Sequence, residues 1–132
     1  MVHVMVVISE TATKERLQES MGALEEVDTR WVTSANEALS ILKEQRFELV
    51  ISDETLPEMT GLQFLNQLVR VNPMVNTALI SALTPEAFHE ATEGLGLLGQ
   101  LPLNPGPPHL KELVSRLKTI LDLQAPRTQQ RK

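Results

Sequence analysis

Three oxygen-bearing side chains follow apolar runs in this sequence. Asp53 follows the run ELVIS, Glu10 follows VMVVIS, and Ser81 follows ALI. Two carboxylates and a hydroxyl suit a hard divalent cation such as Mg²⁺, which binds oxygen ligands and keeps several waters. A carboxylate beside such an ion is also a competent nucleophile towards phosphorus. These residue types therefore allow metal-assisted phosphoryl chemistry if the fold brings them together.

Five short apolar runs predict β-strands, and helical patterns follow them in alternation. The first run is continuous and β-branched, which is typical of a strand covered on both faces. Strict β-α alternation requires parallel pairing, with right-handed crossovers that place helices on both faces. The predicted fold is α/β: a doubly wound, five-stranded parallel sheet of the (βα)5, flavodoxin-like type. The expected strands cover residues 4–8, 30–33, 47–52, 78–81 and 97–101.

The expected helices carry apolar residues three and four positions apart. Ser34 and Glu37 match the S-x-x-E capping box before the second helix, and Thr84-Pro85 matches the start of the fourth. Pro73 ends the third helix, because proline disfavours helical geometry in the residue before it. The apolar faces are expected at Leu17, Met21, Leu24; Ala35, Ala38, Leu39, Leu42; Leu62, Leu65, Leu68, Val69; and Leu110, Leu113, Val114, Leu117, Leu121.

Bulk composition bounds the class of protein. The chain has 132 residues, enough for one domain with a real core, and we expect that domain over residues 1–123 and a polar tail or linker start over 124–132. A formal charge of -5 argues against direct binding to nucleic acid or an anionic membrane. No apolar run approaches the roughly 20 residues of a membrane span, and cysteine is absent. A cytoplasmic location suits such a chain.

Parallel strands place the three oxygen-bearing residues together. The carboxyl ends of such strands lie at one edge of the sheet, where ligands bind near the topological switch point. Glu10, Asp53 and Ser81 are therefore expected around one pocket, although they are far apart in the sequence.

The spacing of Asp53, Pro57 and Gly61 fits a D-x-x-x-P-x-x-x-G loop. With this loop and the five β-α units, the chain resembles the receiver domain of two-component response regulators, from about Val4 to Leu123. Turn chemistry alone is the simpler interpretation of the loop, since aspartate caps, proline fixes φ and glycine takes a left-handed corner.

The resemblance implies a role for each matching residue. Asp53 would be the phosphoacceptor, and the hydroxyl of Ser81 would bind a phosphoryl oxygen. Mg²⁺ would be held by Glu10, Asp53 and the backbone carbonyl of Thr55. Leu101-Pro102 falls where the family has Lys-Pro, so a cis bond is expected before Pro102.

The resemblance also implies partners. The expected phosphoryl donor is a sensor histidine kinase or a phosphotransfer protein, and the domain would be a signalling module rather than an enzyme. An effector domain or protein could dock on the side between Leu95 and Leu103, and a homodimer could form there too. Exposure of Leu98 or Leu103 would favour such a docking surface.

Three positions depart from the family pattern. Ser9 replaces one acid of the pair after the first strand, Leu101 replaces the lysine, and Leu98 replaces the aromatic switch residue. Loss of the lysine removes a charge-assisted contact of about 1.5–3 kcal/mol from the phosphorylated state. Phosphorylation is therefore expected to be about one to two orders of magnitude weaker or slower, and to remain Mg²⁺-dependent.

Other functions stay open. A degenerate receiver acting as a phosphorylation-independent interaction module is favoured by the same three departures. A flavodoxin-like mononucleotide binder ranks far behind, because the loop SETAT has no glycine and the chain has no tyrosine to flank a flavin. A hydrolase with an aspartate nucleophile is also remote, because no second acid follows Asp53 at a spacing suited to acid-base work.

Overall fold

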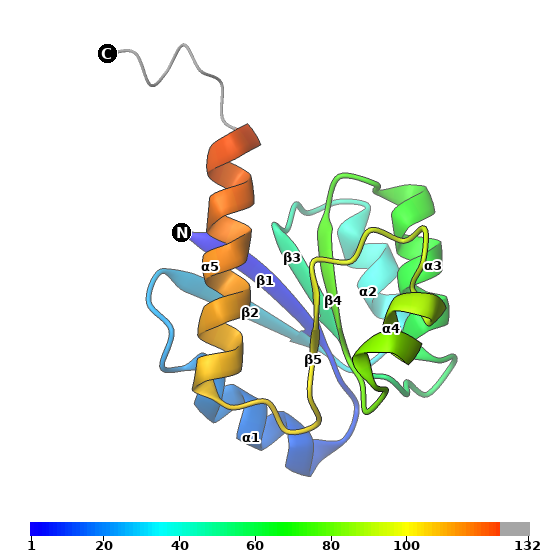
Figure 1. Cartoon of the computed structure of the whole chain (residues 1–132), viewed down its shortest axis with the longest axis horizontal. Helices are drawn as coiled ribbons and strands as arrows, with labels where there is room; N and C mark the ends of the chain where they lie inside the picture. The colour runs from blue at the N-terminus through cyan, green and yellow to red at the C-terminus, as the bar shows by residue number, and fades with distance from the viewer. Residues whose placement is uncertain (125–132) are drawn as a thin grey trace.

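A computed structural model describes residues 1–124 of the chain. Five strands form one sheet in the order β2-β1-β3-β4-β5, and every pair is parallel (Figure 1). The predicted fold class is confirmed. Of the tail predicted over residues 124–132, residues 125–132 lie outside the described part of the chain. The strands are β1 (Val2–Val7), β2 (Val27–Val32), β3 (Leu49–Ser52), β4 (Asn76–Ile80) and β5 (Gly99–Leu101).

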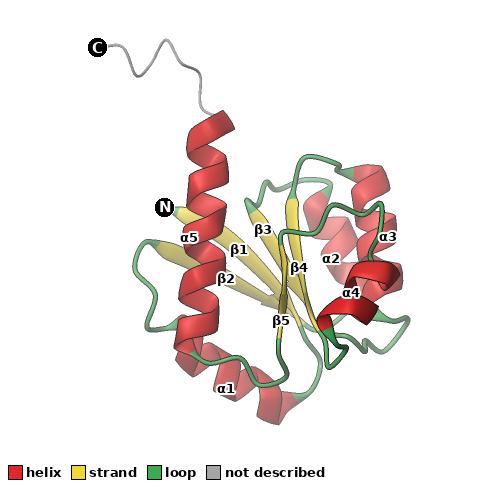
Figure 2. Ribbon diagram, viewed as in Figure 1, coloured by secondary structure: helices red, strands yellow, loops and turns green. Residues whose placement is uncertain are grey.

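Helices cover both faces of the sheet (Figure 2). α1 and α5 pack on one face, and α2, α3 and α4 pack on the other. No described helix is long and apolar enough to cross a membrane. The helices are α1 (Thr11–Met21), α2 (Ala35–Leu42), α3 (Gly61–Val71), α4 (Pro85–Ala91) and α5 (Pro107–Gln124).

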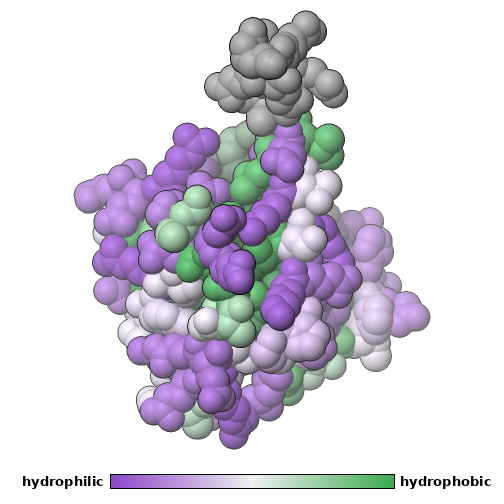
Figure 3. Space-filling model, turned by 90° about the vertical axis from the view of Figure 1, so that its left-hand side faces the viewer, coloured by the Kyte–Doolittle hydropathy of each residue, from purple (hydrophilic) through white to green (hydrophobic). Residues whose placement is uncertain are grey.

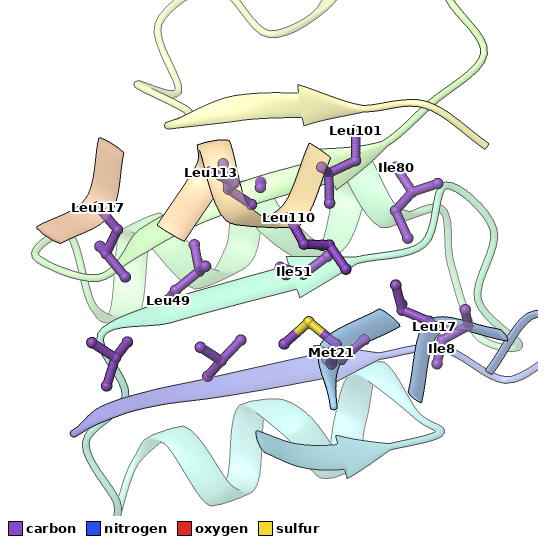
Figure 4. Close-up of a cluster of buried hydrophobic side chains, with 14 residues drawn as sticks. Ile8, Leu17, Met21, Leu49, Ile51, Ile80, Leu101, Leu110, Leu113 and Leu117 are labelled. Carbon is purple, nitrogen blue, oxygen red and sulfur yellow. The ribbon is translucent and has the colours of Figure 1, made fainter. Parts of the chain in front are cut away.

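Alternate residues of each central strand enter opposite cores. In β1, Val4 and Val6 pack towards α1 and α5, while Met5 and Val7 pack towards α2 and α3. Both cores are apolar, as the continuous apolar runs predict, and the second also holds Phe47, Phe64 and Phe88. Figure 4 shows the first core, in which Leu101 of β5 lies among the leucines of α5. This double burial makes the sheet a rigid platform for its loops.

Local sequence signals explain the starts of α2, α3 and α4. The hydroxyl of Thr84 accepts the N–H of Ala87 at 3.2 Å, and Pro85 begins α4 as predicted. Thr60 and Gln63 form a full capping box at the start of α3, a T-x-x-Q signal that the sequence reading missed. β5 is shorter than expected at its start, because Gly94 and Gly96 have positive φ in the preceding loop.

The outer face beside α5 is mostly hydrophilic (Figure 3). Apolar side chains gather in a narrow strip near its middle, with charged and polar side chains on both sides. An apolar strip this narrow is ordinary for a protein surface and points to no particular partner.

Candidate functional site

The carboxyl ends of β1, β3 and β4 meet at one edge of the sheet, at the lower end in Figure 1. The strand order reverses between β1 and β3, so this edge includes the topological switch point where ligands bind in doubly wound folds. The N–H of Asp53 donates to the carbonyl of Val7 at 3.0 Å, and the N–H of Ser81 donates to the carbonyl of Leu101 at 2.9 Å. These bonds fix the backbone of both polar residues on adjacent strands.

Asp53 is partly accessible at this edge. Its Oδ1 accepts the backbone N–H of Glu54 at 2.8 Å. Burial raises the pKa of the Asp53 carboxyl, the Glu54 N–H opposes that shift, and repulsion from the carboxylates of Glu54 and Glu10 adds to it. Asp53 is therefore neither sealed from solvent nor beyond the electrostatic reach of Glu10.

Glu10 and Ser81 flank Asp53 from the neighbouring strands. Glu10 is exposed just before α1, where its Oε1 accepts the hydroxyl of Thr13. Ser81 is only 3% exposed, and its Oγ accepts the N–H of Leu83 at 3.1 Å. A hydroxyl that accepts one bond keeps its own hydrogen to donate. The Ser81 hydroxyl therefore bonds the backbone at the end of β4 and still has its hydrogen available to donate.

Gly61, the last residue of the loop that begins at Asp53, lies too close to other atoms to carry a side chain. A Cβ added to Gly61 would lie 2.0 Å from the carbonyl oxygen of Asp53 and 2.9 Å from the hydroxyl of Ser52. The φ angle of Gly61 is not positive, so the left-handed corner expected from turn chemistry is wrong here. Gly61 is needed because two backbone segments touch directly beneath the site.

Two residues near Asp53 escaped the sequence reading. Ser52 is fully buried, and its hydroxyl donates to the carbonyl of Asp53 at 2.8 Å. Glu54 is partly buried, and its Oε1 lies 3.5 Å from the backbone nitrogen of Ala82. The D-E pair in the sequence was the only available signal for Glu54. The pocket is thus more acidic than Glu10 and Asp53 alone would make it.

The donor set at this edge suits Mg²⁺ better than a soft metal. Its side-chain oxygens come from carboxylates and hydroxyls, and Glu10 and Asp53 are close enough to repel each other. Within residues 1–124 no group of three or more His, Cys, Asp or Glu side chains forms a metal cluster. An ion here would therefore keep several waters, which is how Mg²⁺ is usually bound.

Comparison with known proteins shows which family the chain belongs to. The family model of the response regulator receiver domain matches residues 4–115. The chain belongs to this family. A receiver domain therefore accounts for the (βα)5 fold, and two-component signalling is the process in which the family acts.

Individual relatives fit the same family. The probable chemotaxis protein CheY of Rhizobium etli is 35% identical over 80 residues, which cover 58% of this chain and 61% of that protein. The sensor kinase CckA of Brucella abortus is 30% identical over 111 residues, covering 79% of this chain and 11% of that protein. The chain thus spans less than two thirds of either curated relative.

Solved structures support the fold. A response regulator receiver domain protein from Clostridium thermocellum superposes with a TM-score of 0.82 at 14% identity, over 95% of this chain and 100% of that one. At that identity the likeness concerns the fold alone.

This receiver domain departs from the family pattern at Leu101 in a way the sequence did not show. Leu101 is 1% exposed and belongs to the core beside α5, together with Ile80 and Leu110 (Figure 4). The side chain of Leu101 therefore packs in the core, in addition to lacking the amino group that a lysine would provide at this position.

The expected cis bond before Pro102 is wrong. No cis peptide bond occurs in the described part of the chain. The chain direction changes instead at Asn104, whose φ of 53° is left-handed and whose side-chain oxygen accepts the guanidinium of Arg16 at 2.8 Å. The turn that leads into α5 is therefore made two residues after the proline.

Proposed function

We propose that this receiver domain accepts a phosphoryl group on Asp53 with the help of Mg²⁺. The observation that carries the proposal is the partly accessible Asp53 carboxylate at the switch point, above the Gly61 contact and within electrostatic reach of Glu10. One oxygen, Oδ1, is oriented by the N–H of Glu54, so the other can act as the nucleophile.

The residues around Asp53 would divide the remaining work. Glu10, Asp53 and the backbone carbonyl of Thr55 would hold the ion, which would offset negative charge on the incoming phosphoryl group. The hydroxyl of Ser81 has a hydrogen to donate to a phosphoryl oxygen. Leu101 offers no cation, so binding of the phosphoryl group depends more heavily on Mg²⁺.

Beryllofluoride, a phosphoryl mimic, tests the proposal directly. We expect saturable binding that requires Mg²⁺ and is lost in Asp53→Asn. Asp122→Asn is the matched control, because Asp122 is exposed on α5 and far along the chain from the site. Absence of binding by the wild-type protein in saturating Mg²⁺, or retained binding by Asp53→Asn, would overturn the proposal.

A second function is a receiver that acts without phosphorylation. The burial of Leu101 favours it, because the family's lysine position is committed to the core. Such a module would bind its partner equally well as wild type and as Asp53→Asn. Beryllofluoride binding that requires Asp53 separates the two functions.

The proposed setting is the cytoplasm, with a sensor histidine kinase or a phosphotransfer protein as the donor. The domain would act as a signalling switch and not as a classical enzyme. Its output would pass to an effector, or to a second copy in a homodimer, through the side between Leu95 and Leu103. Leu103 is 50% exposed there, whereas Leu98 is partly buried against the α5 core.

A further inference from the structure

The loop between Asp53 and Gly61 is a small hairpin. Its base is closed by the N–H of Gly61, which donates to the carbonyl of Glu54 at 2.9 Å, and Thr55 pairs with Thr60 in an antiparallel bridge. The N–H of Leu56 donates to the carbonyl of Met59 at 3.0 Å across the turn. The hairpin therefore carries Thr55, the proposed backbone ligand of Mg²⁺.

The tip of this hairpin has little packing of its own. Pro57 and Glu58 are exposed, and Leu56 is the buried side chain that anchors the middle of the loop. An exposed tip of this kind would ordinarily be mobile, because few apolar contacts restrain it. Another contact is needed to hold the tip in one place.

Glu58 supplies that contact at the start of α2. Its Oε1 accepts the backbone N–H of Ala35 at 3.1 Å, and its Oε2 accepts the hydroxyl of Ser34. The same Ser34 oxygen accepts the N–H of Glu37 at 3.2 Å. Ser34 is thus the predicted N-cap, but the carboxylate that joins it comes from Glu58, which is 24 residues away in the sequence.

The chemistry of the contact favours a charged Glu58. A helix start presents unpaired N–H groups and a partial positive charge, both of which stabilise a carboxylate. The hydrogen bond from Ser34 lowers the pKa of Glu58 most; burial opposes the shift, and the backbone N–H groups of Ala35, Glu58 and Asn36 add to it. The contact is therefore formed at neutral pH.

We propose that Glu58 is a positioning residue, which ties the hairpin to the start of α2 and thereby sets the Mg²⁺ affinity at Asp53. The effect on Mg²⁺ affinity, which is the second part of this inference, rests on the proposed function. The first part, the tie between the hairpin and α2, is independent of any metal. Glu58 does not touch the reacting atoms. It acts through the hairpin that connects it to Thr55.

Amide hydrogen exchange tests the tie. In Glu58→Ala we expect the amides of Leu56 and Gly61 to exchange about three- to tenfold faster, the size of effect that loss of one or two hydrogen bonds produces. Glu58→Gln should fall between Ala and wild type, because an amide oxygen still accepts the two bonds without the charge. Glu93→Ala, at an exposed glutamate after α4, is the matched control and should leave both amides unchanged.

Mg²⁺ titration, followed by the amide NMR shifts of Asp53 and Glu54, tests the consequence. We expect the Kd for Mg²⁺ to rise about threefold or more in Glu58→Ala and less in Glu58→Gln. Leu121→Ala, in the last turns of α5, controls for general destabilisation and should leave the Kd unchanged.

Each outcome is decisive. Unchanged exchange of Leu56 and Gly61 in Glu58→Ala would overturn the tie. Faster exchange with an unchanged Kd would show that Glu58 orders the hairpin without positioning the site, which overturns the second part. A wild-type protein that binds no Mg²⁺ would refute the proposed function and that second part, whereas exchange would still report on the tie.

Discussion

Gly61 packs directly against the backbone of Asp53, and this contact gives a physical meaning to the last position of the D-x-x-x-P-x-x-x-G loop. The contact also links α3 to the end of β3, so the residue that starts a helix supports the candidate acceptor. A side chain at Gly61 would push these two segments apart.

Gly61→Ala should therefore lower the free energy of unfolding by about 1–3 kcal/mol, the usual cost of forcing extra atoms into a packed position. Gly106→Ala is the control, because a Cβ there meets nothing closer than 3.6 Å, and its effect should stay within about 0.5 kcal/mol. Urea unfolding of both variants measures the difference. Equal stabilities would contradict the close approach.

Glu58 should titrate below the usual range of a glutamate. Its folded-state pKa is lowered, first by the Ser34 hydroxyl, so its stabilising contribution is complete above the unfolded-state pKa and is lost as pH falls through the folded-state value. Side-chain carbon NMR from neutral to acidic pH should give Glu58 a midpoint below the usual value for glutamate. In Ser34→Ala, the midpoint of Glu58 should move up towards the usual value for glutamate, and no movement would argue against the contact.

At the scale of elements, the β5–α5 segment combines a buried and an exposed leucine two residues apart. Leu101 is 1% exposed and Leu103 is 50% exposed. Leu101→Ala should cost about 2–5 kcal/mol, the range for emptying a leucine site in a core. Leu103→Ala should cost about 0.5 kcal/mol or less. Thermal or urea unfolding measures both, and a small effect at Leu101 would mean that it does not pack in the core.

Elements set by local patterns could be predicted from the sequence. The five strands and the apolar faces of the helices follow from runs and spacings within about ten residues, and the Thr84-Pro85 start of α4 follows from adjacent residues. Glu10 and Asp53 could be placed at one edge because the topology of a parallel sheet requires it.

Contacts between distant segments could not be predicted in the same way. The carboxylate that joins Ser34 comes from Glu58 and not from Glu37, which matched the local motif. The burial of Leu101 depends on how α5 covers the edge strand β5, which no spacing encodes. The cis bond expected before Pro102 came from resemblance alone, and it failed where the turn is built differently.

At the scale of the whole molecule, Mg²⁺ binding and folding should be linked. Glu54 and Glu10 both repel the carboxylate of Asp53, so an ion bound at Asp53 would stabilise the folded state. At ten times its Kd, Mg²⁺ should raise the free energy of unfolding by about 1.4 kcal/mol. Sodium chloride at equal ionic strength controls for screening, and Asp53→Asn should abolish most of the Mg²⁺ effect. An equal gain in both proteins would place the ion elsewhere.

Phosphate incorporation tests the central claim most directly. Wild-type protein incubated with Mg²⁺ and a small-molecule phosphoryl donor should gain one phosphoryl group by intact mass. The group should be lost in alkali, as an acyl phosphate is, and chelation of Mg²⁺ should prevent its addition. Asp53→Asn should gain none under the same conditions. Equal incorporation in Asp53→Asn, or none in the wild-type protein at saturating donor and Mg²⁺, would contradict the assignment of Asp53 as the phosphoacceptor.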